Sequence, residues 1–263
     1  MKVILSRKGF DSGCGGTASP ILPNKTLLSL PIPANEGICY TDIAWQGVTY
    51  LDIIQQLNPK TLINKSSCCH LDPDLRQEVK PREHGWIPAF GQMGAPLTEL
   101  RKQGVTIGDL FLFFGWFKQT EIRDGKLSYI RKAPGLHIIY GYMQIGGIIE
   151  RSEDIPQWLM DHPHVSYHDA WTRGKNAIFL PTEKLSLVPG MPGCGTFKYA
   201  PQRVLTRPGC NCSQWSFPAA MYGTPISHNP NGWRDGFFQS VGRGQEFVME
   251  ATPAVMDWVR SLF

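Results

Sequence analysis

The stretch Arg7–Pro20 holds residues well suited to chemistry, with charged side chains next to four glycines in eight positions. Glycines let the backbone approach a ligand closely and expose its amide groups. Asp11 could serve as a general base, as a nucleophile or as an acceptor for a sugar hydroxyl. A flexible surface loop is the alternative, and it is disfavoured because unlike charges and small residues stand so close together. The ligand contacts expected from this loop are Arg7, Lys8, Ser12, Gly13, Gly15 and Gly16.

The string His70–Asp74 places one histidine and two carboxylates within five residues. If a strand precedes the string, the alternation of side chains puts His70 and Asp72 on the same face. Such groups could bind a metal ion or share acid–base work. An equally supported alternative is a turn in which the Asp side chains bond backbone amides. The catalytic residues predicted from the two segments are Asp11, His70, Asp72 and Asp74, and no metal ligand is assigned.

Two further polar segments could contribute to a site. His162, His164 and His168 lie within seven residues, which suits either a metal site or, as we favour, a polar loop. Gln245 and Glu246 could bind the edge of a base or a sugar hydroxyl. The alternative for that pair is an ordinary turn that leads into a strand.

The segments around these residues favour a sheet with few helices. Continuous apolar runs predict buried strands at Lys2–Ser6 and Asp109–Phe117, and further strands are expected at Thr26–Ile32 and Leu136–Ile149. Strands and helices do not alternate regularly along the chain. This order predicts an α+β fold with a mixed or largely antiparallel, barrel-like sheet and peripheral helices. Helices are predicted at Val48–Leu57, Thr98–Gln103 and Glu153–Met160, and after the cap Thr252.

The composition fits one compact domain over residues 1–263, because 42% of the residues are hydrophobic and 18% are charged. No apolar run approaches the roughly 20 residues of a membrane helix. The first apolar stretch is too short for a signal peptide, so we expect a cytoplasmic protein without a membrane partner. The seven cysteines show no zinc-ribbon spacing and are expected to stay reduced.

The net charge of +4 permits an anionic partner without requiring one. Basic residues stand among aromatic residues in two regions, around Arg203 and Arg207 and around Arg234 and Arg243. That mixture suits phosphate contact combined with base stacking. An ordinary solvated surface is an equally supported alternative.

The strand pair formed by 108–117 and 136–149 resembles that of EVE and related PUA-like barrels, within a subregion of residues 104–190. Those barrels hold a flipped or modified base in an aromatic pocket. The resemblance implies that Trp116 and Tyr142 contact a base. A plain buried hairpin is the slightly favoured alternative.

Several strings, in the same order along the chain, carry a broader resemblance: SRKGFDSGCGGTASPIL, LSLPIP, CHLDPD, GDLFLFFGWF, LHIIYGYMQIGG and GRGQEFV. Together they resemble the third class of the nucleotide-modification-associated domains of bacteria and phages. The resemblance implies an association with systems that modify DNA bases. It supplies no catalytic residue and no cofactor.

Three functions are therefore expected. The first is an enzyme that acts on a nucleotide or a modified DNA base, by glycosidic-bond cleavage or group transfer, for which paired carboxylates are suited. The second is a non-catalytic reader of modified bases in DNA, which would use Phe114, Trp116 and Tyr142. The third is a sensor that sequesters a nucleotide signal through the glycine-rich loop. The enzyme is favoured, and its cofactor is left open.

Overall fold

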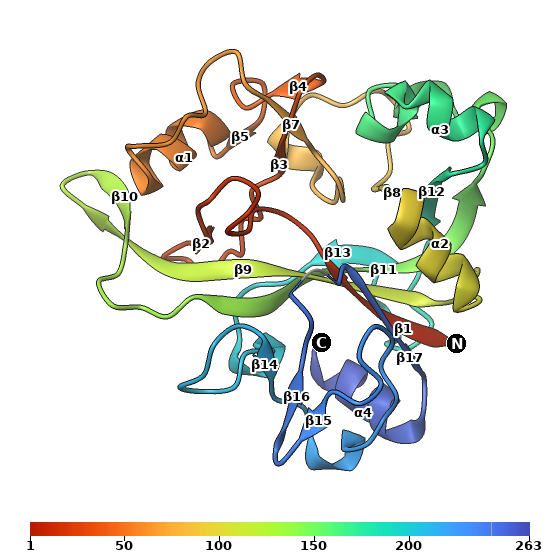
Figure 1. Cartoon of the computed structure of the whole chain (residues 1–263). Coiled ribbons are helices and arrows are strands. Elements are labelled where there is room, and N and C mark those ends of the chain that lie inside the picture. The colour runs from red at the N-terminus through yellow and green to blue at the C-terminus, as the bar shows by residue number, and fades with distance from the viewer. Residues whose placement is uncertain (243) are drawn as a thin grey trace.

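A computed structural model describes residues 1–242 and 244–263, so Arg243 lies outside the described residues. Within the described residues, a nine-stranded sheet forms the centre of the molecule (Figure 1). Its main strands run in the order β17 (Glu246–Glu250), β1 (Lys2–Arg7), β9 (Leu110–Arg123), β11 (Leu136–Ile149), β12 (Asn176–Pro181) and β8 (Phe90–Met93). Shorter strands join this path: β10 (Lys126–Tyr129) and β2 (Ser19–Ile21) pair with β9, and β13 (Cys194–Thr196) pairs with β11.

The sheet is mixed, as expected. β1 and β2 run parallel to β9, whereas β17, β11, β12, β8 and β10 pair with their neighbours in the antiparallel sense. Strands hold 34% of the residues and helices 19%, so the packing of the sheet decides the architecture. The predicted α+β fold with a barrel-like sheet and peripheral helices is confirmed.

The central strands β9 and β11 are long because their apolar sequences are covered on both faces. Leu112 and Phe114 of β9 point into one core cluster, and Phe111 and Phe113 point into another. β9 turns into β10 at Asp124–Gly125, whose φ angles of 52° and 73° are those of a tight hairpin turn. An Asp-Gly pair is typical of such a turn.

The sheet curls into a half-barrel, so its first and last strands approach each other. Gln92 of β8 donates a hydrogen bond from Nε2 to Oε1 of Glu246 in β17, at 2.6 Å. Register shifts next to Gly141 and Gly147 let β11 bend. The curl brings the edge of the sheet at β8 close to the start of the chain.

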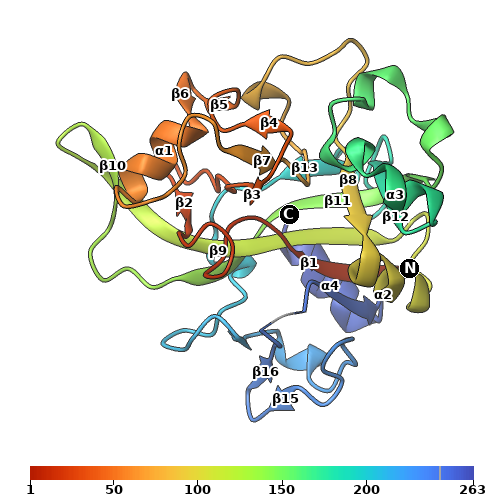
Figure 2. The ribbon, with the colours of Figure 1, turned by 45° about the horizontal axis from the view of Figure 1, so that its top comes forward.

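Different parts of the chain cover the two faces of the sheet (Figure 1). N-terminal elements cover one face: β3 (Ile32–Ala34), β4 (Ile38–Cys39), β5 (Ala44–Trp45), β6 (Val48–Thr49), α1 (Tyr50–Leu57) and β7 (Cys68–His70). C-terminal elements cover the other: β14 (Gln214–Trp215), β15 (Trp233–Arg234), β16 (Phe237–Gln239) and α4 (Pro253–Ser261). As Figure 2 shows, α2 (Gly94–Lys102) and α3 (His168–Thr172) lie at the end of the sheet that holds β8 and β12. Short 3-10 helices connect these elements at Gln77–Val79, Ser152–Asp154, Gln157–Leu159, Pro163–Ser166, Pro201–Arg203 and Ala219–Met221.

Two predicted elements are wrong. Separate 3-10 helices occupy the segment predicted as a helix at Glu153–Met160, because Pro156 interrupts it and cannot donate a helical hydrogen bond. The segment predicted as a strand at Thr26–Ile32 forms isolated bridges, and β3 begins only at its last residue. None of the described helices is long and apolar enough to cross a membrane. The expectation of one domain over residues 1–263 stays a prediction.

His137 lies in the aromatic core on the C-terminal side of the sheet. Its Nδ1 accepts a hydrogen bond from Nε1 of Trp215 at 3.1 Å, and its ring packs edge-on against Phe114. Burial, together with the nearby charge of Arg7, lowers the pKa of His137 to about 3. In the unfolded chain the pKa of a histidine is about 6.5. As the pH falls, His137 therefore becomes protonated in the unfolded chain before it does in the folded chain. The free energy of unfolding decreases as the pH falls from about 6.5 towards 3.

Replacing His137 by Gln should remove this pH dependence while keeping an acceptor for Trp215. Between pH 6.5 and 4.5, the unfolding free energy of the wild-type chain should fall by about 2 kcal/mol more than that of His137→Gln. Urea unfolding of both proteins at the two pH values measures the difference. Equal losses in the two proteins would show that His137 is not buried in its neutral form.

Candidate functional site

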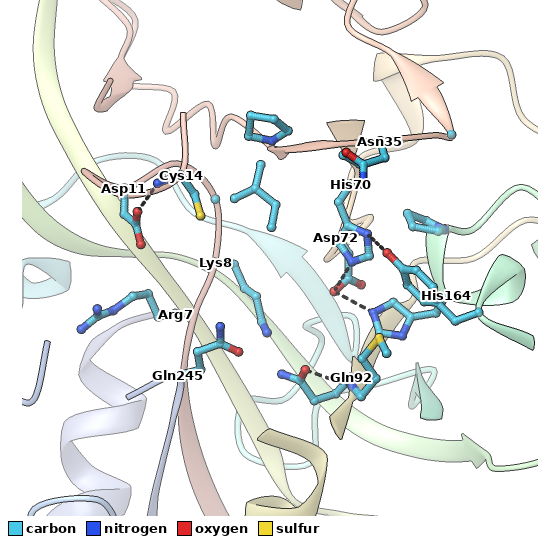
Figure 3. Close-up of a pocket in the computed structure, with 18 of the residues that line it drawn as sticks. Arg7, Lys8, Asp11, Cys14, Asn35, His70, Asp72, Gln92, His164 and Gln245 are labelled. Carbon is cyan, nitrogen blue, oxygen red and sulfur yellow. Dashed lines mark hydrogen bonds and ion pairs between the residues drawn. The ribbon is translucent and has the colours of Figure 1, made fainter. Parts of the chain in front are cut away.

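A cavity of about 650 Å³ opens between the N-terminal elements, the edge of the sheet at β8 and the segment before α3 (Figure 3). The glycine-rich loop lines it with Arg7, Lys8 and Asp11, and the end of β7 lines it with His70 and Asp72. The structure therefore brings the two segments singled out from the sequence to one cavity. Its volume lies in the range of pockets that bind small ligands.

One wall of the cavity is a carboxylate surrounded by imidazoles (Figure 3). Nε2 of His70 and Nε2 of His164 lie 3.9 Å and 3.8 Å from Oδ2 of Asp72. On the other side of the carboxylate, Nε2 of His162 lies 3.3 Å from Oδ1, which also accepts a 2.6 Å hydrogen bond from the amide of Gly91. We name His70, Asp72 and His164 the His–Asp cluster.

Burial and mutual contact set the ionisation of this cluster. Burial alone raises the pKa of Asp72, but the contact with His162 and the neighbouring imidazoles outweighs it and holds the pKa below its usual value. Burial lowers the pKa of His164 to about 3 and also lowers that of His70. At neutral pH the cluster therefore combines an ionised carboxylate with neutral imidazoles.

The ring of His164 is held by the neighbouring strands. Its Nδ1 lies 2.7 Å from Oδ1 of Asn176 in β12, and Nδ2 of Asn176 donates to the backbone oxygen of His164 at 2.9 Å. On the adjacent strand β8, a Cβ at Gly91 would lie 2.2 Å from the ring. Glycine at this position therefore provides the space that the imidazole occupies.

Positive charge lies on the other side of the cavity (Figure 3). The Nζ atom of Lys8 is 3.1 Å from Oε1 of Glu246 and 4.5 Å from the centre of the Phe90 ring. Arg7 donates a hydrogen bond from Nη1 to the backbone oxygen of Gly242 at 2.5 Å. Its buried Nε has no hydrogen-bond partner among the described residues. This side can therefore attract an anionic group.

The predicted pair Gln245 and Glu246 divides between the cavity and its support. Gln245 is exposed and lines the cavity. Glu246 is fully buried and does not line it, and its Oε1 accepts hydrogen bonds from Ser6 Oγ at 2.9 Å and from Gln92 Nε2 at 2.6 Å. Glu246 is thus placed to hold Lys8 and Gln92, which do line the cavity.

Asp11 organises the glycine-rich loop. Its Oδ1 accepts hydrogen bonds from the amides of Gly13 and Cys14, both at 2.7 Å. Gly15 has a φ of 84°, and a Cβ there would lie 2.4 Å from the ring of Phe10. Only glycine fits that position without strain. The predicted contacts Ser12, Gly13, Gly15 and Gly16 do not line the cavity, and their contact with a ligand stays a prediction.

Three residues predicted from the sequence stand apart from the cavity. Asp74 accepts hydrogen bonds from both Nη atoms of Arg82, each at 2.6 Å. Tyr142 is buried, and its hydroxyl donates to the backbone oxygen of Pro192. Trp116 of β9 is half-buried and does not line the cavity. The cavity therefore lends no geometric support to their predicted roles.

Other lining residues were not predicted. Gln92 and Tyr167 line the cavity, and the hydroxyl of Tyr167 lies 3.4 Å from Nδ1 of His70. His164 also lines the cavity, although the sequence favours a polar loop for His162, His164 and His168. The His-Pro-His spacing of residues 162–164 is the one signal in the sequence that points to His164 as a site residue. No local feature of the sequence indicates that it lies next to His70–Asp74.

The arrangement can do two kinds of chemistry. Neutral imidazoles next to a carboxylate can accept and donate protons at neutral pH. One ligand atom from each residue of the His–Asp cluster also lies within 4.8 Å of the others, which suits a metal ion. Both uses face the same cavity.

Replacing Arg82 by Ala should destabilise the fold. The side chains of Arg82 and Asp74 are 5% and 6% exposed, so the variant leaves a buried, unpaired carboxylate at a cost of about 3 kcal/mol. Arg151→Ala is the matched control, because it breaks an exposed ion pair with Asp154 and should cost less than about 1 kcal/mol. Urea unfolding measures both variants. Similar costs for the two would argue against a structural role for the Asp74 pair.

Comparison with known proteins identifies the family. Residues 2–250 match the family described as nucleotide modification associated domain 3. No curated protein and no solved structure matches the chain, and the resemblance to PUA-like barrels stays unconfirmed. Because the family match spans most of the chain, the expected relationship is confirmed, and the chain belongs to the nucleotide modification associated domain 3 family.

Proposed function

We propose that this protein is an enzyme that acts on a nucleotide or a modified DNA base bound in the cavity, by cleavage or transfer at the bond between base and sugar. The observation that carries the proposal is the separation of charge across the cavity. Lys8 and Arg7 lie on one side, and the ionised Asp72 with neutral His70 lies on the other. A nucleotide has a matching asymmetry, with an anionic phosphate at one end and the base–sugar bond farther along.

The basic side suits the phosphate. The ammonium group of Lys8 has three donors, and its contact with Glu246 uses one of them. Arg7 lines the same side of the cavity. Charge-assisted hydrogen bonds of this kind are the strong contacts of phosphate sites.

The His–Asp cluster suits the reacting end. The side chain of His70 is 16% exposed and lines the cavity, so a bound ligand can reach it. A neutral imidazole beside a carboxylate can activate a water molecule or a hydroxyl group for attack. Asp11 lines the same cavity and could supply a second carboxylate.

The cavity favours an enzyme over the reader of modified bases. The reader would use Phe114, Trp116 and Tyr142, which do not line the cavity. The family description supports nucleotide modification in general terms. A nucleotide sensor would bind its ligand through the same basic side and would not need the His–Asp cluster. The enzyme and the sensor can therefore be distinguished by whether the bound nucleotide is converted to a product.

Mass spectrometry of released bases tests the proposal. The full chain is incubated with nucleoside 5′-monophosphates and with phage DNA that carries modified bases. Asp72→Asn should lower the rate of base release or transfer at least about a hundredfold, because it removes the ionised group of the cluster. His84→Gln is the matched control, since His84 is exposed and does not line the cavity.

Two outcomes would overturn the proposal. A rate that is unchanged in Asp72→Asn would place the chemistry elsewhere. Retention of a nucleotide without turnover of any compound in the panel would identify a sensor instead of an enzyme. Thermal unfolding of each variant shows whether a lost rate reflects a lost fold.

A further inference from the structure

The ligand atoms of the His–Asp cluster face one another without bonding. Oδ2 of Asp72 lies 3.9 Å from Nε2 of His70 and 3.8 Å from Nε2 of His164. These separations are too long for hydrogen bonds. Tetrahedral ligands at about 2.1 Å from a metal ion lie about 3.4 Å apart, so the two distances to Oδ2 exceed that spacing by about half an ångström or less.

The hydrogen bonds of Asn176 determine which nitrogen of His164 carries the proton. Nδ2 of Asn176 donates to the backbone oxygen of His164, so Oδ1 of Asn176 is left as the acceptor for Nδ1–H of the ring. In the neutral ring, Nε2 then presents a lone pair towards Asp72. A lone pair that faces a carboxylate oxygen is repelled unless a cation lies between them.

Asp72 is oriented in a complementary way. Its Oδ1 accepts from the amide of Gly91 and faces Nε2 of His162. Nδ1 of His162 accepts from the amide of His164, which leaves its proton on Nε2, towards the carboxylate. Among the described residues, no hydrogen bond reaches Oδ2, the oxygen that faces the cluster. Such outer contacts typically orient the ligands of metal sites.

One side of the cluster faces the cavity. Gly91 and Asn176 lie behind it on the sheet edge, whereas all three members of the cluster line the cavity. A metal ion held there would keep coordination positions open towards a bound molecule. Open positions distinguish catalytic from structural metal sites.

We propose that His70, Asp72 and His164 bind a divalent transition-metal ion of the Zn²⁺, Fe²⁺ or Mn²⁺ class, with open coordination positions that face the cavity. Imidazole nitrogens combined with one carboxylate select this class over Mg²⁺ and Ca²⁺, which prefer sites made of oxygen ligands. Water or an oxygen atom of the substrate occupies the open positions.

The metal site would take part in the proposed reaction, and this role rests on the proposed function. With the nitrogen of His70 bound to the ion, the cation, in place of the free imidazole, would bind and polarise the attacking water next to the base–sugar bond. Metal binding itself requires no substrate. It can therefore be measured whether or not the proposed reaction takes place.

Titration of the full chain, freed of metal by a chelator, tests the proposal. Co²⁺ should give visible absorption bands that saturate at one ion per chain, and Zn²⁺ should displace it while Mg²⁺ should not. His70→Gln should weaken Zn²⁺ binding more than about a hundredfold in calorimetry, beyond the usual effect of an outer contact. His168→Gln is the matched control, since His168 is exposed and does not line the cavity.

The thiols of Cys39 and Cys68, whose sulfur atoms lie 3.9 Å apart, are the alternative ligands, and Cys68→Ser tests them. Absence of Co²⁺ and Zn²⁺ binding would overturn the proposal. So would binding that survives His70→Gln or that is lost in Cys68→Ser. Stoichiometric Zn²⁺ without action on any nucleotide would remove the proposed function and leave the metal site. Base release by the metal-free protein would leave the proposed function and show that the metal ion takes no part in the reaction.

Discussion

The buried carboxylate of Glu246 is the interaction on which the rest of the structure depends. It is completely shielded from solvent, and its Oε1 accepts hydrogen bonds from Ser6, Lys8 and Gln92. A buried carboxylate costs several kcal/mol unless it is paired in this way. These partners come from β1, the residue after it and β8, so the hydrogen bonds of one carboxylate oxygen join the opposite ends of the sheet. The same contacts fix Lys8 and Gln92, which line the cavity. The same carboxylate therefore supports both the closed sheet and the cavity.

The elements that the sequence predicts well are those decided by short-range chemistry. β11 has the predicted bounds Leu136–Ile149, and the C-terminal helix begins where Thr252 caps it and Pro253 occupies the first turn. The failed helix at Glu153–Met160 has the apolar residues of a helix but is interrupted by Pro156. The failed strand at Thr26–Ile32 is apolar because the core buries it. Burial alone does not provide the ladder partners that make a strand.

The residues of the candidate site likewise divide into those that the local sequence predicts and those that depend on distant parts of the chain. Local composition was enough to single out Arg7, Lys8, His70 and Asp72, and the cavity brings them together. It could not reveal His164, because the contact with Asp72 joins segments far apart in the chain. Nor could it show that Glu246 is a buried support and not an exposed contact, since that depends on the curl of the sheet. Sequence spacing carries information about neighbours on one element and very little about which elements meet.

The two sides of the cavity differ in how firmly they are built, and this difference bears on selectivity. Asp72 and His164 are fixed by the amide of Gly91 on β8 and by the side chain of Asn176 on β12, which are paired strands of the sheet. Groups held by a sheet keep their geometry whatever the ligand, as a reacting centre requires. The glycine-rich loop is held by Asp11 through local hydrogen bonds, and much of it is exposed. Under the proposed function, variation in that loop would change which ligand enters while the His–Asp cluster stays unchanged.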